Sequence, residues 1–210
     1  MKLLYSALAA LTLTVPLAAV SERTAEAPAP PCCREGLPPG KYSDQSLYRL
    51  NAVWTSDVGR EIKLEVLRGR PQVIALFFTN CEHSCPFIVA DMKAIERALP
   101  TNLRDKVDFL LVSIDPDRDT PAALHAFREK HALGTEHWTL LRGTPEATRE
   151  LAQMVGFNFQ PGSPTQFAHS LLISVLNPAG EIVYQHSGLG HPTDEPVAAL
   201  ARSVKAKKKN

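Results

Sequence analysis

Residues 72–86 read QVIALFFTNCEHSCP, and this stretch gives the strongest indication of the fold in the whole chain. Residues 72–78 form an almost continuous apolar run, which is the pattern of a β-strand buried on both faces. Pro86 suits the first position of a helix, because proline lacks the N–H that would find no partner there. The sequence therefore predicts a buried strand, a short loop with two cysteines and a helix in direct succession.

Strand and helix patterns alternate on both sides of this stretch. Threonine followed by proline marks two helix starts, since threonine is a good N-cap and proline a good first residue. Further strands are expected at 53–55, 61–64, 107–114 and 138–141, and a hairpin at 171–176 and 181–186. Helices are expected at 86–99, from Thr120 and Pro121 onward, from Thr144 and Pro145 to about 155, and at 193–204. This order predicts an α/β sandwich with a mixed central sheet flanked by helices, compatible with a thioredoxin-like fold.

Composition divides the chain into four segments. Residues 1–21 are typical of a signal peptide cleaved after Ser21, and their apolar run is also long enough for a membrane anchor. Residues 22–46 are rich in proline and alanine and predict a flexible arm, 47–204 the folded domain, and 205–210 a basic tail. Export places the domain outside the cytoplasm, in the periplasm, either soluble or anchored to the inner membrane.

Net charge and cysteine usage narrow the class of protein further. The 210 residues carry a net charge of +1, which does not indicate a nucleic-acid partner. Two of the four cysteines, Cys32 and Cys33, lie in the predicted arm. Adjacent cysteines can capture Cu(I), form a strained vicinal disulfide or link to another chain. The residues before Cys32 do not resemble a lipidation signal.

Candidate site residues gather where predicted strands end. Cys81 and Cys85 follow the buried strand at 72–78, and Asp115 follows the strand at 107–114. Ligands of open α/β sheets bind at the carboxyl ends of parallel strands. His169 precedes the strand at 171–176, so it reaches the same edge if that strand runs antiparallel to the first two. This arrangement would bring two thiols, an imidazole and a carboxylate together.

Two thiols separated by three residues can form a disulfide, hold a soft metal or attack a substrate. Thiolates suit Cu(I), and two thiolates with one imidazole also suit Cu(II) when a position stays open. A structural zinc site normally has four protein ligands, whereas only three are evident in this sequence. The helix N-terminus next to Cys85 favours its thiolate, which helps metal binding and nucleophilic chemistry alike.

Three motifs together resemble the Sco/SenC family of copper-binding, thioredoxin-fold proteins. They are residues 78–86, residues 115–121, and His169 before residues 170–173. The resemblance implies that Cys81, Cys85 and His169 hold copper, as Cu(I) or Cu(II). It also implies a metallochaperone that delivers copper to the copper-A-containing subunit of cytochrome c oxidase. Family members commonly carry proline and aspartate after the first cysteine, where this chain has Glu82 and His83, so its partner surface differs.

Two other functions compete with this interpretation. The first is an extracytoplasmic thiol–disulfide oxidoreductase, in which Cys81 and Cys85 form a redox-active disulfide and act on a thiol-redox partner. Its usual spacing is Cys-x2-Cys, not Cys-x3-Cys. The second is a peroxiredoxin-type peroxidase, but Thr79 lies two residues before Cys81 instead of three. We therefore expect a metal-binding chaperone more than an enzyme.

The remaining polar candidates receive weaker predictions. Asp115 and Asp119 either support the metal site or form turns and caps, and Asp115, at the strand end, is the better functional candidate. His83 is expected in a solvated loop. The other histidines are interpreted as structural or surface residues: His125, His131, His137, His186 and His191.

Overall fold

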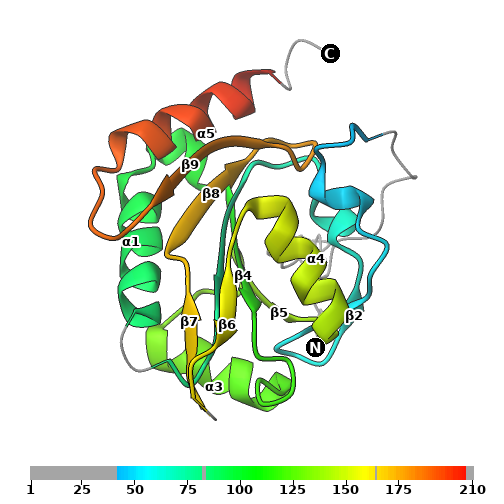
Figure 1. The fold of residues 1–210 in the computed structure, drawn as a ribbon. Coiled ribbons are helices and arrows are strands. Elements are labelled where there is room, and N and C mark those ends of the chain that lie inside the picture. Colours follow the sequence, from blue (N-terminus) through cyan, green and yellow to red (C-terminus); the bar gives the residue numbers. More distant parts are fainter. Residues whose placement is uncertain (1–41, 82–83, 164, 207–210) are drawn as a thin grey trace, which may run out of the picture.

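The computed structural model describes residues 42–81, 84–163 and 165–206, which form a central sheet with helices on both faces (Figure 1). The predicted signal segment, the part of the arm with Cys32 and Cys33, His83 and the end of the basic tail lie outside the described residues. The boundaries of the four segments therefore stay predictions. Within the described residues, no helix has both the length and the apolar character that crossing a membrane requires.

The elements follow the predicted alternation. The strands are β1 (Trp54–Ser56), β2 (Glu61–Ile62), β3 (Gln72–Phe77), β4 (Asp108–Ser113), β5 (Trp138–Arg142), β6 (Phe159–Pro161), β7 (Phe167–His169), β8 (Leu172–Leu176) and β9 (Ile182–Ser187). The helices are α1 (Cys85–Ala98), α2 (Thr101–Arg104), α3 (Pro121–His131), α4 (Pro145–Val155) and α5 (Asp194–Ala206), with 3₁₀ turns at Leu47–Arg49 and Leu64–Leu67. The sequence patterns missed the β6–β7 hairpin, α2 and both 3₁₀ turns.

Seven strands form one mixed sheet in the order β2-β1-β5-β4-β3-β8-β9. β3, β4 and β5 are parallel, whereas β8 runs antiparallel to β3, and β9 antiparallel to β8. All residues of β3 and β4 are buried, which explains their continuous apolar sequences. The predicted α/β sandwich with a mixed sheet is confirmed.

The helices cover both faces of this sheet. On one face, Lys93 of α1 donates to the carbonyl oxygen of His131 in α3 at 2.9 Å, and α5 packs against α1, β8 and β9. On the other face, Gln185 of β9 donates to the carbonyl oxygen of Val155, the last residue of α4, at 2.9 Å. Side chains alternate along a strand, so Gln185 lies opposite its neighbour Tyr184, which contacts Glu195 of α5. The sheet is therefore the middle of three layers.

The two predicted helix starts are confirmed by capping hydrogen bonds. Thr120 and Thr144 each accept from the backbone N–H three residues further on, at 3.2 Å. A proline follows each threonine as the first helical residue. These starts could be predicted because a cap is a local interaction that depends on a few adjacent residues.

A buried ion pair joins the turn after β1 to α3. The Arg128 guanidinium donates to both carboxylate oxygens of Asp57, at 2.5 and 3.0 Å, and to the carbonyl oxygens of Leu133 and Trp138. Both side chains are almost completely excluded from solvent. Such a pair is stabilising only while it is complete, because each charge would be costly to bury alone.

We predict that Asp57→Ala lowers the free energy of unfolding by about 3–5 kcal/mol, since it leaves the Arg128 charge buried without a partner. Urea unfolding followed by circular dichroism measures this loss. The matched control is Glu146→Ala, which breaks the exposed Glu146–Arg149 pair and should leave the unfolding midpoint unchanged. Equal midpoints for both variants would contradict the prediction.

Candidate metal centre

The loop with the two cysteines continues directly from the buried end of β3. Phe78 is completely buried, and its carbonyl oxygen accepts from the N–H of Cys81 at 3.3 Å. α1 begins at Cys85, one residue earlier than predicted. Cys81 and Cys85 are free thiols that are 8% and 0% exposed. The loop therefore presents two sulfur atoms at the carboxyl edge of the sheet.

His169 lies beside this loop although it is more than eighty residues away along the chain. The strand after His169 reaches the same edge only if it runs antiparallel to β3, and the β3–β8 pairing confirms this direction. His169 is the last residue of β7 instead of part of a simple connection. The sulfur atoms of Cys81 and Cys85 and a ring nitrogen of His169 lie within 4.8 Å of one another. They are the only such cluster of three or more ligand groups among the described residues.

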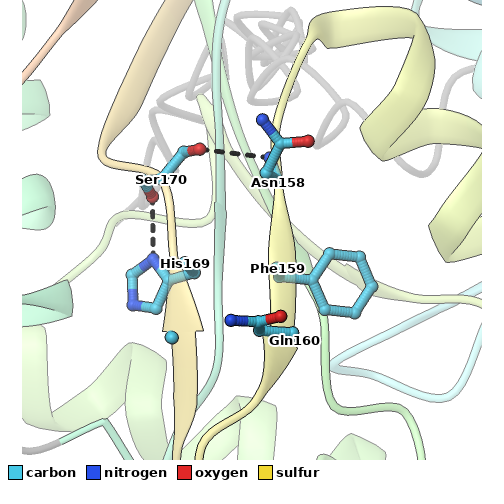
Figure 2. A pocket seen from close by; sticks show the side chains of 6 residues that line it. Asn158, Phe159, Gln160, His169 and Ser170 are labelled. Carbon is cyan, nitrogen blue, oxygen red and sulfur yellow. Dashed lines mark hydrogen bonds between the residues drawn. The ribbon is translucent and has the colours of Figure 1, made fainter.

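The imidazole of His169 is oriented with one nitrogen available. Figure 2 shows its Nδ1 next to the carbonyl oxygen of Ser170, at 2.7 Å. A carbonyl oxygen only accepts, so Nδ1 carries a proton, and in the neutral ring Nε2 keeps a lone pair. The ring of Phe157 stacks on the imidazole, and the ring of Phe78 meets it edge-on, both at 5.8 Å between centroids. These contacts hold Nε2 ready to bind a metal ion.

One side of His169 faces an open hollow of about 500 Å³. Asn158, Gln160 and Ser170 contribute polar groups to its wall, and Phe159 lies beside them (Figure 2). The two thiols are buried, whereas this wall includes the imidazole. A partner molecule would therefore reach the ligand cluster most directly from the His169 side.

The β6–β7 hairpin, which was not predicted from the sequence, fixes His169 against the cysteine loop. Phe167 of β7 meets Phe78 edge-on at 5.2 Å between ring centroids. The Gln166 side chain donates to the carbonyl oxygen of Asn80 at 3.0 Å. Phe159 and Phe167 on either side of the turn residues at 162–163 were an available signal for a short hairpin.

The two thiols have opposite proton affinities. Hydrogen bonds to the Cys81 sulfur, above all the one from the Cys85 thiol and also the one from the Cys85 N–H, lower the pKa of Cys81 to about 3. The same Cys81 contact and burial raise the pKa of Cys85. The expectation that the helix N-terminus favours a Cys85 thiolate is therefore wrong. The backbone N–H of Cys85, at the start of α1, instead donates a hydrogen bond to the Cys81 sulfur at 3.4 Å.

Asp119 ties the cysteine loop to the segment after β4. Its carboxylate accepts from the N–H of Thr79 at 3.1 Å, from the Thr79 hydroxyl at 2.5 Å and from the Ser113 hydroxyl. Asp119 is completely buried, and burial raises its pKa despite these hydrogen bonds. The loop that carries Cys81 therefore depends on this carboxylate.

Asp115, which the sequence favoured over Asp119, points elsewhere. Its carboxylate accepts from Nε of Arg118 at 2.6 Å and lines a separate cavity of about 350 Å³. Asp119 instead accepts the hydrogen bonds of Thr79, which lies two residues before Cys81, and so holds the start of the cysteine loop. The ranking of the two aspartates from sequence is therefore reversed by the geometry.

The histidines that we interpreted as structural or surface residues make contacts of that kind. Nδ1 of His125 lies 3.7 Å from a carboxylate oxygen of Asp57, and Nδ1 of His137 lies 3.7 Å from one of Asp108. The ring of His131 packs on Phe127. His186 and His191 pack on each other at 4.6 Å between centroids. None of these five belongs to the ligand cluster.

We predict that iodoacetamide alkylates Cys81 well before Cys85 near pH 5. With its pKa near 3, Cys81 is already a thiolate there, whereas the raised pKa keeps Cys85 protonated. Peptide mass spectrometry after timed alkylation measures the ratio. In a Cys85→Ala variant the hydrogen-bond donor is gone, so Cys81 alkylation near pH 5 should slow. Equal labelling of both thiols in the unmodified chain would refute the assignment.

We further predict that Asp119→Asn weakens Cu(I) binding by about tenfold, in the range found for groups that support metal ligands. The amide offers fewer acceptor sites to Thr79 and Ser113, so the loop loses its fixed start. Chelator competition measures the affinity, and Asp115→Asn is the matched control, with no change expected. A larger effect at Asp115 than at Asp119 would show that the geometric ranking is wrong.

Comparisons of this chain with family profiles, curated sequences and solved structures all point to the same protein family. The SCO1/SenC family profile matches residues 49–205. The SCO1 protein homolog of Bacillus subtilis is 25% identical over 149 residues, which are 70% of this chain and 77% of that protein. The solved structures of other members show the same thioredoxin-like fold.

Two of these solved structures illustrate the likeness. Arabidopsis thaliana ScoI with copper bound is 19% identical, with a TM-score of 0.64 over 74% of this chain and 96% of that one. A SCO1/SenC family lipoprotein from Bacillus anthracis is 24% identical, with a TM-score of 0.66 over 72% and 92%. Since the family profile extends over nearly the whole described region, this protein belongs to the SCO1/SenC family.

Proposed function

We propose that this protein is a copper metallochaperone, which binds copper through Cys81, Cys85 and His169 and passes it to a respiratory oxidase. The observation that carries the proposal is the convergence of two sulfur atoms and one imidazole nitrogen within 4.8 Å. Copper is bound in the Arabidopsis thaliana relative. Sco proteins are a family of cytochrome c oxidase assembly proteins, so the recipient we propose is the copper-A-containing subunit.

The donor set suits copper better than harder metals. Thiolate sulfur is a soft ligand that selects Cu(I), and imidazole suits both oxidation states of copper. Of the two thiols, Cys81 is already a thiolate, so only Cys85 has to lose a proton when the ion binds. The site is therefore close to its binding form before the metal arrives.

The geometry also suits transfer by ligand exchange. Cys85 is completely buried, whereas His169 lies beside the open hollow. A thiolate or imidazole of the recipient can approach from that side and replace His169 first. The two thiolates would then hold the ion until the recipient completes its own ligand set.

The thiol–disulfide oxidoreductase is less favoured. Thiol exchange needs two sulfur atoms, and it leaves the oriented imidazole without a role. The peroxidase is also less favoured, since the Thr79 hydroxyl donates to Asp119 and not to Cys81. Robust peroxidase turnover by the reduced chain would overturn this ranking.

We also propose that the domain works outside the cytoplasm, soluble in the periplasm or held at the inner membrane by residues 1–21. The apolar segment after Lys2 supports export. The Bacillus anthracis relative is a lipoprotein. Mass spectrometry of the mature chain tests cleavage after Ser21, and a mature chain that still starts at Met1 would favour the anchor.

A copper titration tests the proposed function. In the full chain with Cys32 and Cys33 changed to serine, we expect one tightly bound Cu(I), measured by chelator competition, and thiolate-to-Cu(II) absorption after Cu(II) addition. His169→Ala should weaken binding, because it removes one of three ligands. The control is His137→Ala, since His137 contacts Asp105 and Asp108 instead of the thiols.

The outcomes separate the candidate functions. Weak binding that is indifferent to His169 would reject the metallochaperone and make the Cys81–Cys85 reduction potential the next quantity to measure. An additional Cu(I) in the chain that retains Cys32 and Cys33 would assign auxiliary copper capture to the arm. The same stoichiometry with and without these two cysteines would reject that role.

A further inference from the structure

Ser84 occupies the N-cap position of α1 but does not cap the helix. Its backbone is already helical, at φ −95° and ψ −33°, and its side chain makes no capping hydrogen bond. Serine is among the preferred N-cap residues, and Thr120 and Thr144 cap their helices in this same protein. The Ser84 hydroxyl is therefore diverted from its usual local role.

The hydroxyl lies between two of the proposed copper ligands instead. Its oxygen is 3.1 Å from Nε2 of His169 and 3.5 Å from the sulfur of Cys81. In the neutral ring, whose one proton is the one that Nδ1 donates to Ser170, Nε2 accepts, and the Ser84 O–H donates to it. The lone pair that accepts this hydrogen bond is the one that a copper ion would need. The Ser84 hydroxyl and a copper ion therefore cannot bind Nε2 of His169 at the same time.

His169 does not need Ser84 to hold its orientation. Its Nδ1–H is bonded to Ser170, Phe157 stacks on one face of the ring, and Phe78 meets the ring edge-on. These three contacts act on parts of the imidazole that copper does not use. Removing the Ser84 hydroxyl should consequently free Nε2 without releasing the ring.

We propose that Ser84 promotes copper release by competing with the ion for Nε2 of His169. This inference rests on the proposed copper function and concerns the release of the copper ion from the same site. As the copper–nitrogen bond breaks, the hydroxyl forms its hydrogen bond to Nε2, and no proton or electron changes place. Ser84 is thus a positioning residue and not a ligand.

The bound state gives the hydroxyl a poorer partner. With Nε2 on copper, the Ser84 proton can turn only to the Cys81 sulfur among these two groups, which lies farther away, at 3.5 Å, and would itself be donating its electrons to the ion. Binding copper therefore exchanges a good hydrogen bond for a weak one. This difference makes His169 the ligand that leaves most easily.

The test compares variants of the full chain that has serine at positions 32 and 33. We expect Ser84→Ala to bind Cu(I) about two- to tenfold more tightly in chelator competition, and to release it more slowly by a similar factor, as the loss of one competing hydrogen bond implies. Ser84→Thr keeps the hydroxyl and should behave like the parent. Tighter binding by Ser84→Thr as well, or weaker binding by Ser84→Ala, would overturn the proposal.

A double-mutant cycle with His169→Ala shows whether the effect passes through the imidazole. In the His169→Ala background, Ser84→Ala should not change the affinity, and an equal change there would overturn the competition. If His169→Ala weakens binding while Ser84→Ala alone has no effect, only this inference fails. If His169→Ala itself binds like the parent, the proposed ligand set fails and the competition with it.

A spectroscopic readout separates competition from a general structural role. In the metal-free protein, Ser84→Ala should shift the ¹⁵N resonance of Nε2 in His169, because it loses its hydrogen-bond donor. The Nδ1–H resonance should stay, since its bond to Ser170 is retained. Loss of the Nδ1–H signal in Ser84→Ala would mean that the ring itself is released, which contradicts the proposal.

Discussion

The antiparallel pairing of β3 with β8 is the constraint on which the site depends. Ala75 pairs with Ile173 and Gln72 with Leu176, so β8 runs away from the edge toward which β3 runs. The chain that enters β8 must therefore lie where β3 ends. This places His169 next to a loop more than eighty residues earlier in the sequence. The imidazole reaches the thiols because a sheet register is rigid over its whole length.

The protein satisfies buried polar groups with one another. At this edge Asp119 takes the hydrogen bonds of Thr79 and Ser113, and toward the opposite edge, where β5 begins, Asp57 takes those of Arg128. Each unpaired group would be costly at this depth, so the partners are held in one geometry. The cysteine loop is thereby fixed at its start by a carboxylate and at its end by α1. A metal site gains from such support, since its ligands need little reorganisation when the ion arrives.

Two residues show how tertiary contacts override local preferences at the site. Ser84 is placed and suited to cap α1, yet its hydroxyl lies against His169 and Cys81. Cys85 stands at the start of a helix, yet the thiolate is stabilised at Cys81, because burial and the contact between the sulfurs outweigh the helix end. Departures from local rules are expected where a fold serves a function. Here both departures concern the handling of one ligand cluster.

Features that depend on neighbouring residues could be predicted from the sequence alone. The apolar run at 72–78 predicted a strand buried on both faces, and the threonine–proline pairs predicted the starts of α3 and α4. The runs at 171–176 and 181–186 predicted the hairpin of β8 and β9. The three ligand candidates also came from sequence, helped by the family resemblance. Four features became visible only in the folded protein: the β6–β7 hairpin, the role of Asp119 instead of Asp115, the location of the thiolate at Cys81 and the contact of Ser84 with His169. Each of these depends on groups distant in the chain, whose distances no local pattern contains.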